Sequence, residues 1–438
     1  MREAPRPAYA APAATPLTSA PFPAPSAPAA RYAPPTLASA GARTCTLESP
    51  VEIAAIDGDP TALFEVQTSI AFGRSGGLFV WQGRDEDTQA WARPLGIDGR
   101  PVAPAMAFPA AASFVMHKLI AVEGGFAALY NVPASPPDRD TYYLQVFGPN
   151  GEPRRGPVKL EMGGFGWHAE SEAVGNRLIV FGVPNADTVR LRSRVLLITL
   201  NPEGGVKQEK LDFPISSASV AVSMALDEKR WAVTVRVDNG VPGEMFVFGG
   251  QAKKPVASSG GRGSKVPVRG AESLIVDGVL HPIRDEGAAG DGARPLNNPY
   301  QIAWSGGELA VTWFAGEPGS RTKPRFGRLS IDGQLHVETT DEREKTIRAA
   351  FEGRVSAELE SNATILVRET PWGERVGAPT PLAEVFPYMP GGDLGMEVRW
   401  SGDRFVIAYI QPVDEKTVDD KVHLRLVAVR CDGDGKGG

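Results

Sequence analysis

The feature that most constrains the fold is an internal repeat that recurs about every 50 residues through most of the chain. Each copy contains a short apolar segment, a turn, a second apolar segment, a variable stretch, a third apolar segment, a second turn and a fourth segment. The clearest copies span 69–108, 301–339 and 397–433. The first turns of the copies are marked by Gly76, Gly124, Gly175, Glu228, Gly306, Gly353 and Gly402.

These copies predict an all-β protein. The apolar segments are short, are rich in Val, Ile, Leu, Phe and Trp, and lack a helical period. A four-stranded meander repeated at this interval is typical of one blade of a β-propeller, and neighbouring blades must cover both of its faces. The seven turns predict a single propeller of seven four-stranded blades over residues 42–432. A β-sandwich with accidental spacing is the alternative.

One step of the repeat is longer than the others, between Glu228 and Gly306. Most of the excess lies in residues 258–298, which begin and end with flexible, glycine-rich sequence and contain one hairpin-like stretch, ESLIVDGVLHPI. We interpret this segment as an insertion on one blade. A degenerate eighth blade is the alternative.

The two ends of the chain differ in composition from the repeats. Residues 1–41 are rich in Pro and Ala and predict a disordered, extended spacer, and residues 433–438 predict a flexible tail. Such a spacer is often found ahead of an exported or lipid-anchored domain, although no apolar leader segment is visible. A plain disordered N-terminus is the alternative.

The last copy ends after its third strand, and the segment 44–54 has no copy of its own. Placing this segment as the missing fourth strand closes the propeller and removes two open sheet edges. The same placement brings Cys45 and Cys431, the two cysteines of the chain, within reach of a disulfide bond. A disulfide indicates a periplasmic, cell-surface or secreted protein. Two buried free thiols in a cytoplasmic protein are the alternative.

Two segments carry the repeat best, Trp304–Gly307 and Trp400–Asp403, with Asp98–Gly99 and Asp332–Gly333 as second turns. Together they resemble the β-propeller repeats of exported proteins from myxobacteria and related bacteria. The resemblance implies export and binding, and it implies no specific chemistry. The closing Trp-Asp dipeptide, the kelch double glycine and the aspartate box of better-known blades do not occur in the sequence.

The sequence contains no recognisable catalytic, metal-binding or cofactor motif. Its five histidines are dispersed, no HExxH, CxxC or GxSxG pattern is present, and we expect no metal and no cofactor. A net charge of -6 does not suggest a nucleic-acid-binding surface. No apolar run is long enough for a transmembrane helix.

Topology indicates where a binding site belongs. The connections between second and third strands, and the links between copies, are long and varied, and functional residues concentrate on loops carried by a rigid scaffold. We expect an aromatic platform on these connections, formed by Phe165, Trp167, His168, Phe386, Tyr388 and Met389. Hydrophobic covering of the blade ends is the alternative interpretation of these residues.

Three functions fit these features of the sequence. The first is a non-catalytic, extracytoplasmic binding or scaffold protein that recognises a protein or glycan through its long connections. The second is a glycan hydrolase or lyase with acidic residues at the mouth of the propeller, and the third is a structural subunit of a cell-surface assembly. No catalytic residue can be assigned for the second.

Overall fold

A computed structural model of the chain describes most of the repeat region. The described residues are 45–57, 67–82, 89–108, 115–132, 141–161, 165–174, 177–184, 193–201, 205–213, 222–226, 231–236, 246–247, 257–258, 272–276, 279–282, 284–285, 297–305, 308–315, 323–329, 334–337, 346–352, 355–360, 364–369, 374–381, 396–411 and 421–431. Every secondary-structure element within them is a β-strand, so the predicted all-β class is confirmed.

Most strands form antiparallel sheets that follow the chain, in which a strand pairs with the next one. The first two sheets contain β3 (Gln67–Gly73), β4 (Gly76–Gln82), β5 (Trp91–Leu95) and β6 (Met106–Ala107), then β7 (Val115–Val122), β8 (Gly125–Val132), β9 (Thr141–Phe147) and β10 (Val158–Lys159). The third contains β11 (Phe165–Val174), β12 (Arg177–Pro184), β13 (Ser193–Leu200) and β14 (Val206–Phe213).

The later sheets repeat this pattern with additions at their edges. One contains β22 (Asn297–Ser305), β23 (Glu308–Ala315), β24 (Lys323–Leu329) and β25 (Gln334–Val337), with β21 (Arg284–Asp285) pairing parallel to β25. The next contains β26 (Thr346–Glu352), β27 (Val355–Glu360), β28 (Thr364–Glu369) and β29 (Glu374–Pro381). The last begins with β30 (Met396–Trp400), β31 (Phe405–Gln411) and β32 (Lys421–Cys431).

The expected role of residues 258–298 is wrong in both of its forms. The hairpin of β19 (Glu272–Val276) and β20 (Val279–Pro282) joins β15 (Val222–Leu226) and β16 (Trp231–Arg236), and supplies the third and fourth strands of their sheet. The segment is therefore neither a blade insertion nor an eighth blade. The interruption falls earlier, between β16 and β19, where β17 (Phe246–Val247) and β18 (Ala257–Ser258) form a separate pair.

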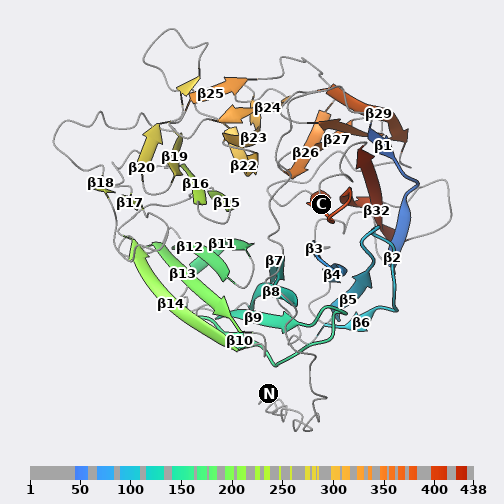
Figure 1. Cartoon of the computed structure of the whole chain (residues 1–438), viewed down its shortest axis with the longest axis horizontal. Coiled ribbons are helices and arrows are strands. Elements are labelled where there is room, and N and C mark those ends of the chain that lie inside the picture. The colour runs from blue at the N-terminus through green and yellow to red at the C-terminus, as the bar shows by residue number, and fades with distance from the viewer. Residues whose placement is uncertain are drawn as a thin grey trace, which may run out of the picture. The chain divides into compact units, whose positions relative to one another are not determined.

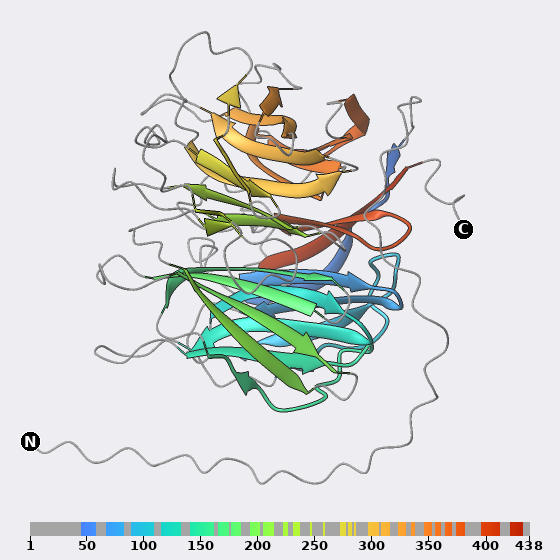
Figure 2. The same ribbon diagram turned by 60° about the vertical axis from the view of Figure 1, so that its left-hand side comes forward.

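The prediction that the N-terminal segment pairs with the last strand is confirmed. Two short strands, β1 (Cys45–Leu47) and β2 (Val51–Asp57), both pair antiparallel with β32. Figure 1 shows β1 and β2, at the start of the chain, beside β32 at its end, and Figure 2 shows the same strands from another side. The outer strand of the last sheet therefore comes from the opposite end of the chain.

The first strands of successive sheets contact one another in chain order. β3 contacts β7, β7 contacts β11, and the series continues through β15, β22, β26 and β30. β30 in turn contacts β3, so the series returns to its start. Each of the seven sheets whose first strand belongs to this series therefore has a neighbour on both sides, as two apolar faces require.

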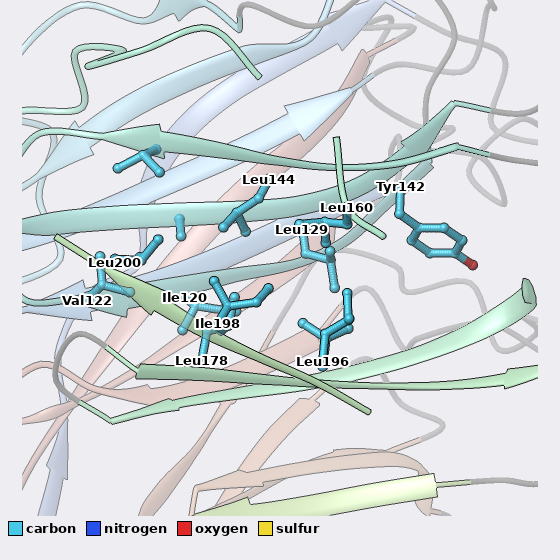
Figure 3. Close-up of a cluster of buried hydrophobic side chains, with 13 residues drawn as sticks. Ile120, Val122, Leu129, Tyr142, Leu144, Leu160, Leu178, Leu196, Ile198 and Leu200 are labelled. Atoms are coloured by element: carbon cyan, nitrogen blue, oxygen red, sulfur yellow. The ribbon is translucent and has the colours of Figure 1, made fainter. Parts of the chain in front are cut away.

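Apolar side chains fill the spaces between neighbouring sheets. The sheets β7–β10 and β11–β14 enclose one cluster, in which Leu129, Leu144, Leu178 and Leu196 are at most 1% exposed (Figure 3). Alternate residues of β8 belong to this cluster and to the cluster against β3–β6. Both faces of β8 are therefore buried, which explains why its sequence is an almost continuous apolar run.

The turns that join third to fourth strands pack against the preceding sheet. Gly99 and Gly151 occupy corresponding turns with φ of 79° and 80°, and in each turn the glycine N–H donates to a carbonyl three residues earlier. A Cβ on Gly99 would lie 3.2 Å from Val406 in β31, and a Cβ on Gly151 would lie 2.8 Å from Leu78 in β4. Both turns therefore need glycine for the backbone conformation and for the close approach.

The last sheet reproduces this arrangement without a covalent turn. The N–H of Glu48 donates to Ala428 O at 2.8 Å, as the N–H of Val102 donates to Pro94 O and that of Arg154 to Val146 O in the first two sheets. β1 thus takes the place of the residues that follow the turn in other sheets. Cys45 lies directly opposite Cys431 in the register, at the position where the turn would be.

Candidate functional site

Three residues of the predicted aromatic platform lie within the described strands, and the platform itself stays a prediction. Phe165, Trp167 and His168 lie in β11, which pairs with β12 through an irregularity between Phe165 and Ala169, and not in a connecting loop as expected. The expected loop is wrong for these three residues: the glycine-containing sequence resembles a loop, whereas the long partner strand β12 extends the pairing as far as Pro184. Phe386, Tyr388 and Met389 lie outside the described residues.

The last sheet has its short first turn between Trp400 and Phe405. Charged side chains at that end of the sheet bind one another. The guanidinium of Arg404 donates to Glu48 at 2.6 Å and to both carboxylate oxygens of Asp403, at 2.9 and 2.7 Å. Hydrogen bonds from Arg404 lower the pKa of Asp403, although burial opposes the shift. This cluster joins the N-terminal segment to the first turn of the last sheet. Its side chains are already paired with one another.

The first strands carry polar side chains that bind the neighbouring strand. The N–H of Ile70 donates to Glu397 Oε2 at 2.8 Å, and the N–H of Leu119 donates to Ser69 Oγ at 2.9 Å. Glu397 and Ser69 occupy equivalent register positions in β30 and β3, so the contact is repeated from sheet to sheet. Glu397 also accepts a hydrogen bond from Arg399 at 2.7 Å. The side chains of Glu397 and Ser69 therefore link neighbouring sheets through hydrogen bonds.

At the opposite end of the sheets, an aromatic residue recurs at one position of the second strand. Trp81, Tyr130 and Tyr409 occupy this position in β4, β8 and β31, and they are 6%, 1% and 4% exposed. Trp313 has the same register position in β23. The sequence signal was present in the stretches LFVWQ, FAALYN, LAVTWF and FVIAYI. It was missed because these aromatic residues read as core positions of a strand.

Each of these aromatic residues faces a large side chain on the third strand. Trp81 pairs with Trp91, Tyr130 with Tyr143, Tyr409 with Arg425, and Trp313 with Arg325. In the first three pairs the second-strand member is buried, whereas Trp91 is 38% exposed and the side chain of Arg425 is 31% exposed. This set of pairs therefore lies at the boundary between the cores and solvent, at the end from which the second-to-third connections leave.

The tyrosine pair has a fixed ring geometry. The rings of Tyr130 and Tyr143 stack with centroids 5.7 Å apart, and Phe108 packs edge-on against Tyr130 at 5.8 Å. Burial, together with the neighbouring Tyr143, raises the pKa of Tyr130 far above its ordinary value. The Tyr130 hydroxyl therefore stays protonated at any physiological pH.

The partner of Tyr409 on the third strand carries a charge, as does Arg325, which faces Trp313. Arg425 lies opposite Tyr409, and its Nη2 is 3.7 Å from Glu52 Oε2 on β2. His423, two residues before Arg425, has its Nδ1 2.8 Å from the same Glu52 oxygen. One face of the last sheet therefore carries a phenol ring from β31, a guanidinium and an imidazole from β32, and a carboxylate from β2.

Neither a metal centre nor a membrane-spanning helix is found in the part of the chain that the structure describes. Within these residues, no three His, Cys, Asp or Glu side chains are grouped so that they could hold a metal ion. No helix long and apolar enough to cross a membrane occurs among them.

Comparisons with known proteins found distant likenesses in solved structures. No protein-family model matches it, and no curated protein sequence matches it. Among solved structures it is similar to the crystal structure of the computationally designed Ika8 protein, with 10% identity and a TM-score of 0.38 over 82% of this chain and 96% of that chain. It is also similar to human WBSCR16, with 10% identity and a TM-score of 0.37 over 83% of this chain and 86% of that chain.

Proposed function

We propose that the sheets are the blades of a seven-bladed β-propeller, which acts as a non-catalytic extracytoplasmic binding or scaffold protein for a protein or glycan. The cyclic order of contacts between first strands supports the propeller. The pairing of β1 and β2 with β32 supports its closure by the N-terminal segment. Seven sheets have a first strand in this series, in agreement with seven blades.

We further propose that Cys45 and Cys431 form a disulfide bond. The antiparallel register sets them directly opposite each other, Cys45 is 2% exposed, and no described cysteine is free. Facing residues in an antiparallel pair have Cα atoms about 4.5 to 5.5 Å apart, which suits disulfide geometry. The bond would replace the covalent turn that closes the other sheets, and it would indicate an oxidising compartment.

One observation favours binding at the end from which the second-to-third connections leave. At the end with the short first turn, the charged groups of the last sheet, Arg404, Glu48 and Asp403, are hydrogen-bonded to one another. At the opposite end, Trp91 and Arg425 remain partly exposed beside buried aromatic rings. Partly exposed Trp and Arg anchored on rigid strands are typical of recognition surfaces.

The test replaces two connections at that end. We expect that exchanging residues 133–140 and 412–420 for Gly/Ser sequences of equal length abolishes capture of a partner from an envelope extract and binding to immobilised glycans. A matched control, Glu152→Gln in a turn at the other end, should bind like the parent protein. Binding that survives both exchanges would contradict the proposed face.

A further inference from the structure

The turn between β9 and β10 contains an asparagine followed by a glycine, Asn150–Gly151. Asn150 is exposed, and its backbone N–H donates to Glu152 Oε2 at 3.2 Å. Its side-chain carboxamide makes no hydrogen bond to another described residue. The carbonyl carbon of this carboxamide is therefore open to attack by a neighbouring nucleophile.

The neighbouring nucleophile is the backbone nitrogen of Gly151. When this nitrogen bonds to Asn150 Cγ, a succinimide ring closes, and the bond from Cγ to the side-chain nitrogen breaks to release ammonia, which carries away the amide proton. Water then opens the ring at either carbonyl and leaves aspartate or isoaspartate, so the sequence needs no oxidant or reductant. Glycine favours ring closure because it has no Cβ to crowd the attacking nitrogen.

Other described positions lack this combination of exposure, free carboxamide and following glycine. Asn131 is 4% exposed and precedes a β-branched valine. Asn201 precedes a proline, whose nitrogen has no hydrogen to lose. Asp98 precedes glycine in the turn that corresponds to Asn150, but its Oδ1 accepts a hydrogen bond from the N–H of Arg100 at 3.0 Å.

We propose that Asn150 is a site of spontaneous deamidation in the folded protein, and that its product loosens the contact between the sheets β3–β6 and β7–β10. Gly151 is buried, and a Cβ on it would lie 2.8 Å from Leu78 of the preceding sheet, so the turn has little room to move. Isoaspartate lengthens the main chain of the turn by a methylene group. It also sets a carboxylate beside that of Glu152, and like charges repel.

The turn itself controls the rate of the reaction. The N–H of Gly151 donates to Gly148 O at 3.1 Å, and this hydrogen bond must open before the nitrogen can attack. The folded chain should therefore deamidate at Asn150 more slowly than the chain unfolded in urea. The assignment does not depend on the proposed binding function.

The test incubates the full chain at mildly alkaline pH in water enriched in heavy oxygen, digests it in ordinary water and analyses the peptides by mass spectrometry. Label marks deamidation during the incubation, and fragmentation distinguishes isoaspartate from aspartate. We expect both products at position 150, formed at least about tenfold faster than at Asn131, which corresponds to about 1.4 kcal/mol in activation free energy. The other Asn-Gly pair, Asn239–Gly240, lies outside the described residues and is quantified in its own peptide.

Two variants test the structural part of the argument. Asp98→Asn places Asn-Gly in the corresponding turn, where the N–H of Arg100 can hold the side chain, and it should deamidate there more slowly than at Asn150. Asn150→Ser cannot form the ring, so its urea midpoint should stay constant through the incubation while that of the parent protein falls.

Three outcomes would overturn the proposal. Absence of label at position 150 in the folded chain would remove the site. Equal rates at positions 98 and 150 would refute the role of the side-chain contact. A parent urea midpoint that stays constant while isoaspartate accumulates would show that the modification does not loosen the sheets.

Discussion

The turn at Gly151 provides a direct test of how neighbouring sheets are held together. This residue has a φ of 80°, and a Cβ there would lie 2.8 Å from Leu78 Cδ1 and 3.3 Å from Pro94 Cγ of the preceding sheet. Gly124 has a similar φ of 77°, but a Cβ there would lie no closer than 3.6 Å to Arg154. At Gly156 a Cβ would meet nothing within 4 Å. Comparing alanine substitutions at these three positions therefore distinguishes the cost of backbone strain from the cost of contact between sheets.

Alanine at each position has a different expected cost. The left-handed conformation costs an L-residue about 1–2 kcal/mol, so Gly124→Ala should lower the free energy of unfolding by that amount. Gly151→Ala adds the cost of forcing a methyl group against a fully buried leucine, about 1–3 kcal/mol, for a total of about 2–5 kcal/mol. Gly156→Ala should change stability by about zero to +1 kcal/mol, because alanine restricts the unfolded chain.

Urea unfolding followed by tryptophan fluorescence measures these differences. The midpoints should fall in the order Gly156→Ala, Gly124→Ala, Gly151→Ala, with the slope of the transition unchanged so that the midpoints report stability. Equal midpoints for Gly124→Ala and Gly151→Ala would show that the turn does not press on the preceding sheet, and would refute this account of sheet packing.

The remaining predictions concern the closure and the contacts between first strands. Cys45→Ser should lower stability by up to about 5 kcal/mol, since the proposed disulfide closes nearly the whole chain; intact mass with and without reductant should show whether the bond exists. Arg404→Met should make the melting temperature depend less on pH between about pH 5 and about pH 3. The reason is that Arg404 lowers the pKa of Asp403 below its ordinary 3.8, so the pair stabilises the fold above that value and the stabilisation is lost as the pH falls through the lowered pKa. An unchanged pH dependence would contradict this role. Ser69→Ala should cost about 1–3 kcal/mol in chemical unfolding, because it leaves the buried N–H of Leu119 without its acceptor; a neutral result would show that the contact does not hold the sheets together.

Local sequence patterns predicted the strands well but not every partner. The apolar runs and the glycine turns, such as those at Gly76 and Gly124, identified hairpins that the structure confirms. The hairpin of residues 272–282 was also visible, yet its sheet was misjudged. A hairpin has the same local pattern whichever sheet it joins, and pairing across the 35 residues between Arg236 and Glu272 depends on long-range contacts.

The candidate site shows the same limit more strongly. Trp81, Tyr130 and Tyr409 could be recognised in the sequence only as buried strand residues. Their importance comes from their partners on the third strand, and for Tyr409 also from Glu52 on the N-terminal strand. No local pattern relates Glu52 to Arg425, because they are brought together only when the chain ends pair.

The sequence by itself determined the all-β class, the repeat and the pairing of the N-terminal segment with the last strand, because hydrophobic alternation and turn residues act locally and the repeat left one strand without a partner. Only the tertiary structure decided which hairpin completed the sheet begun by β15 and β16, and which distant side chains, such as Glu52 and Arg425, came together. Both depend on contacts between residues far apart in the chain, whose energies no local pattern encodes.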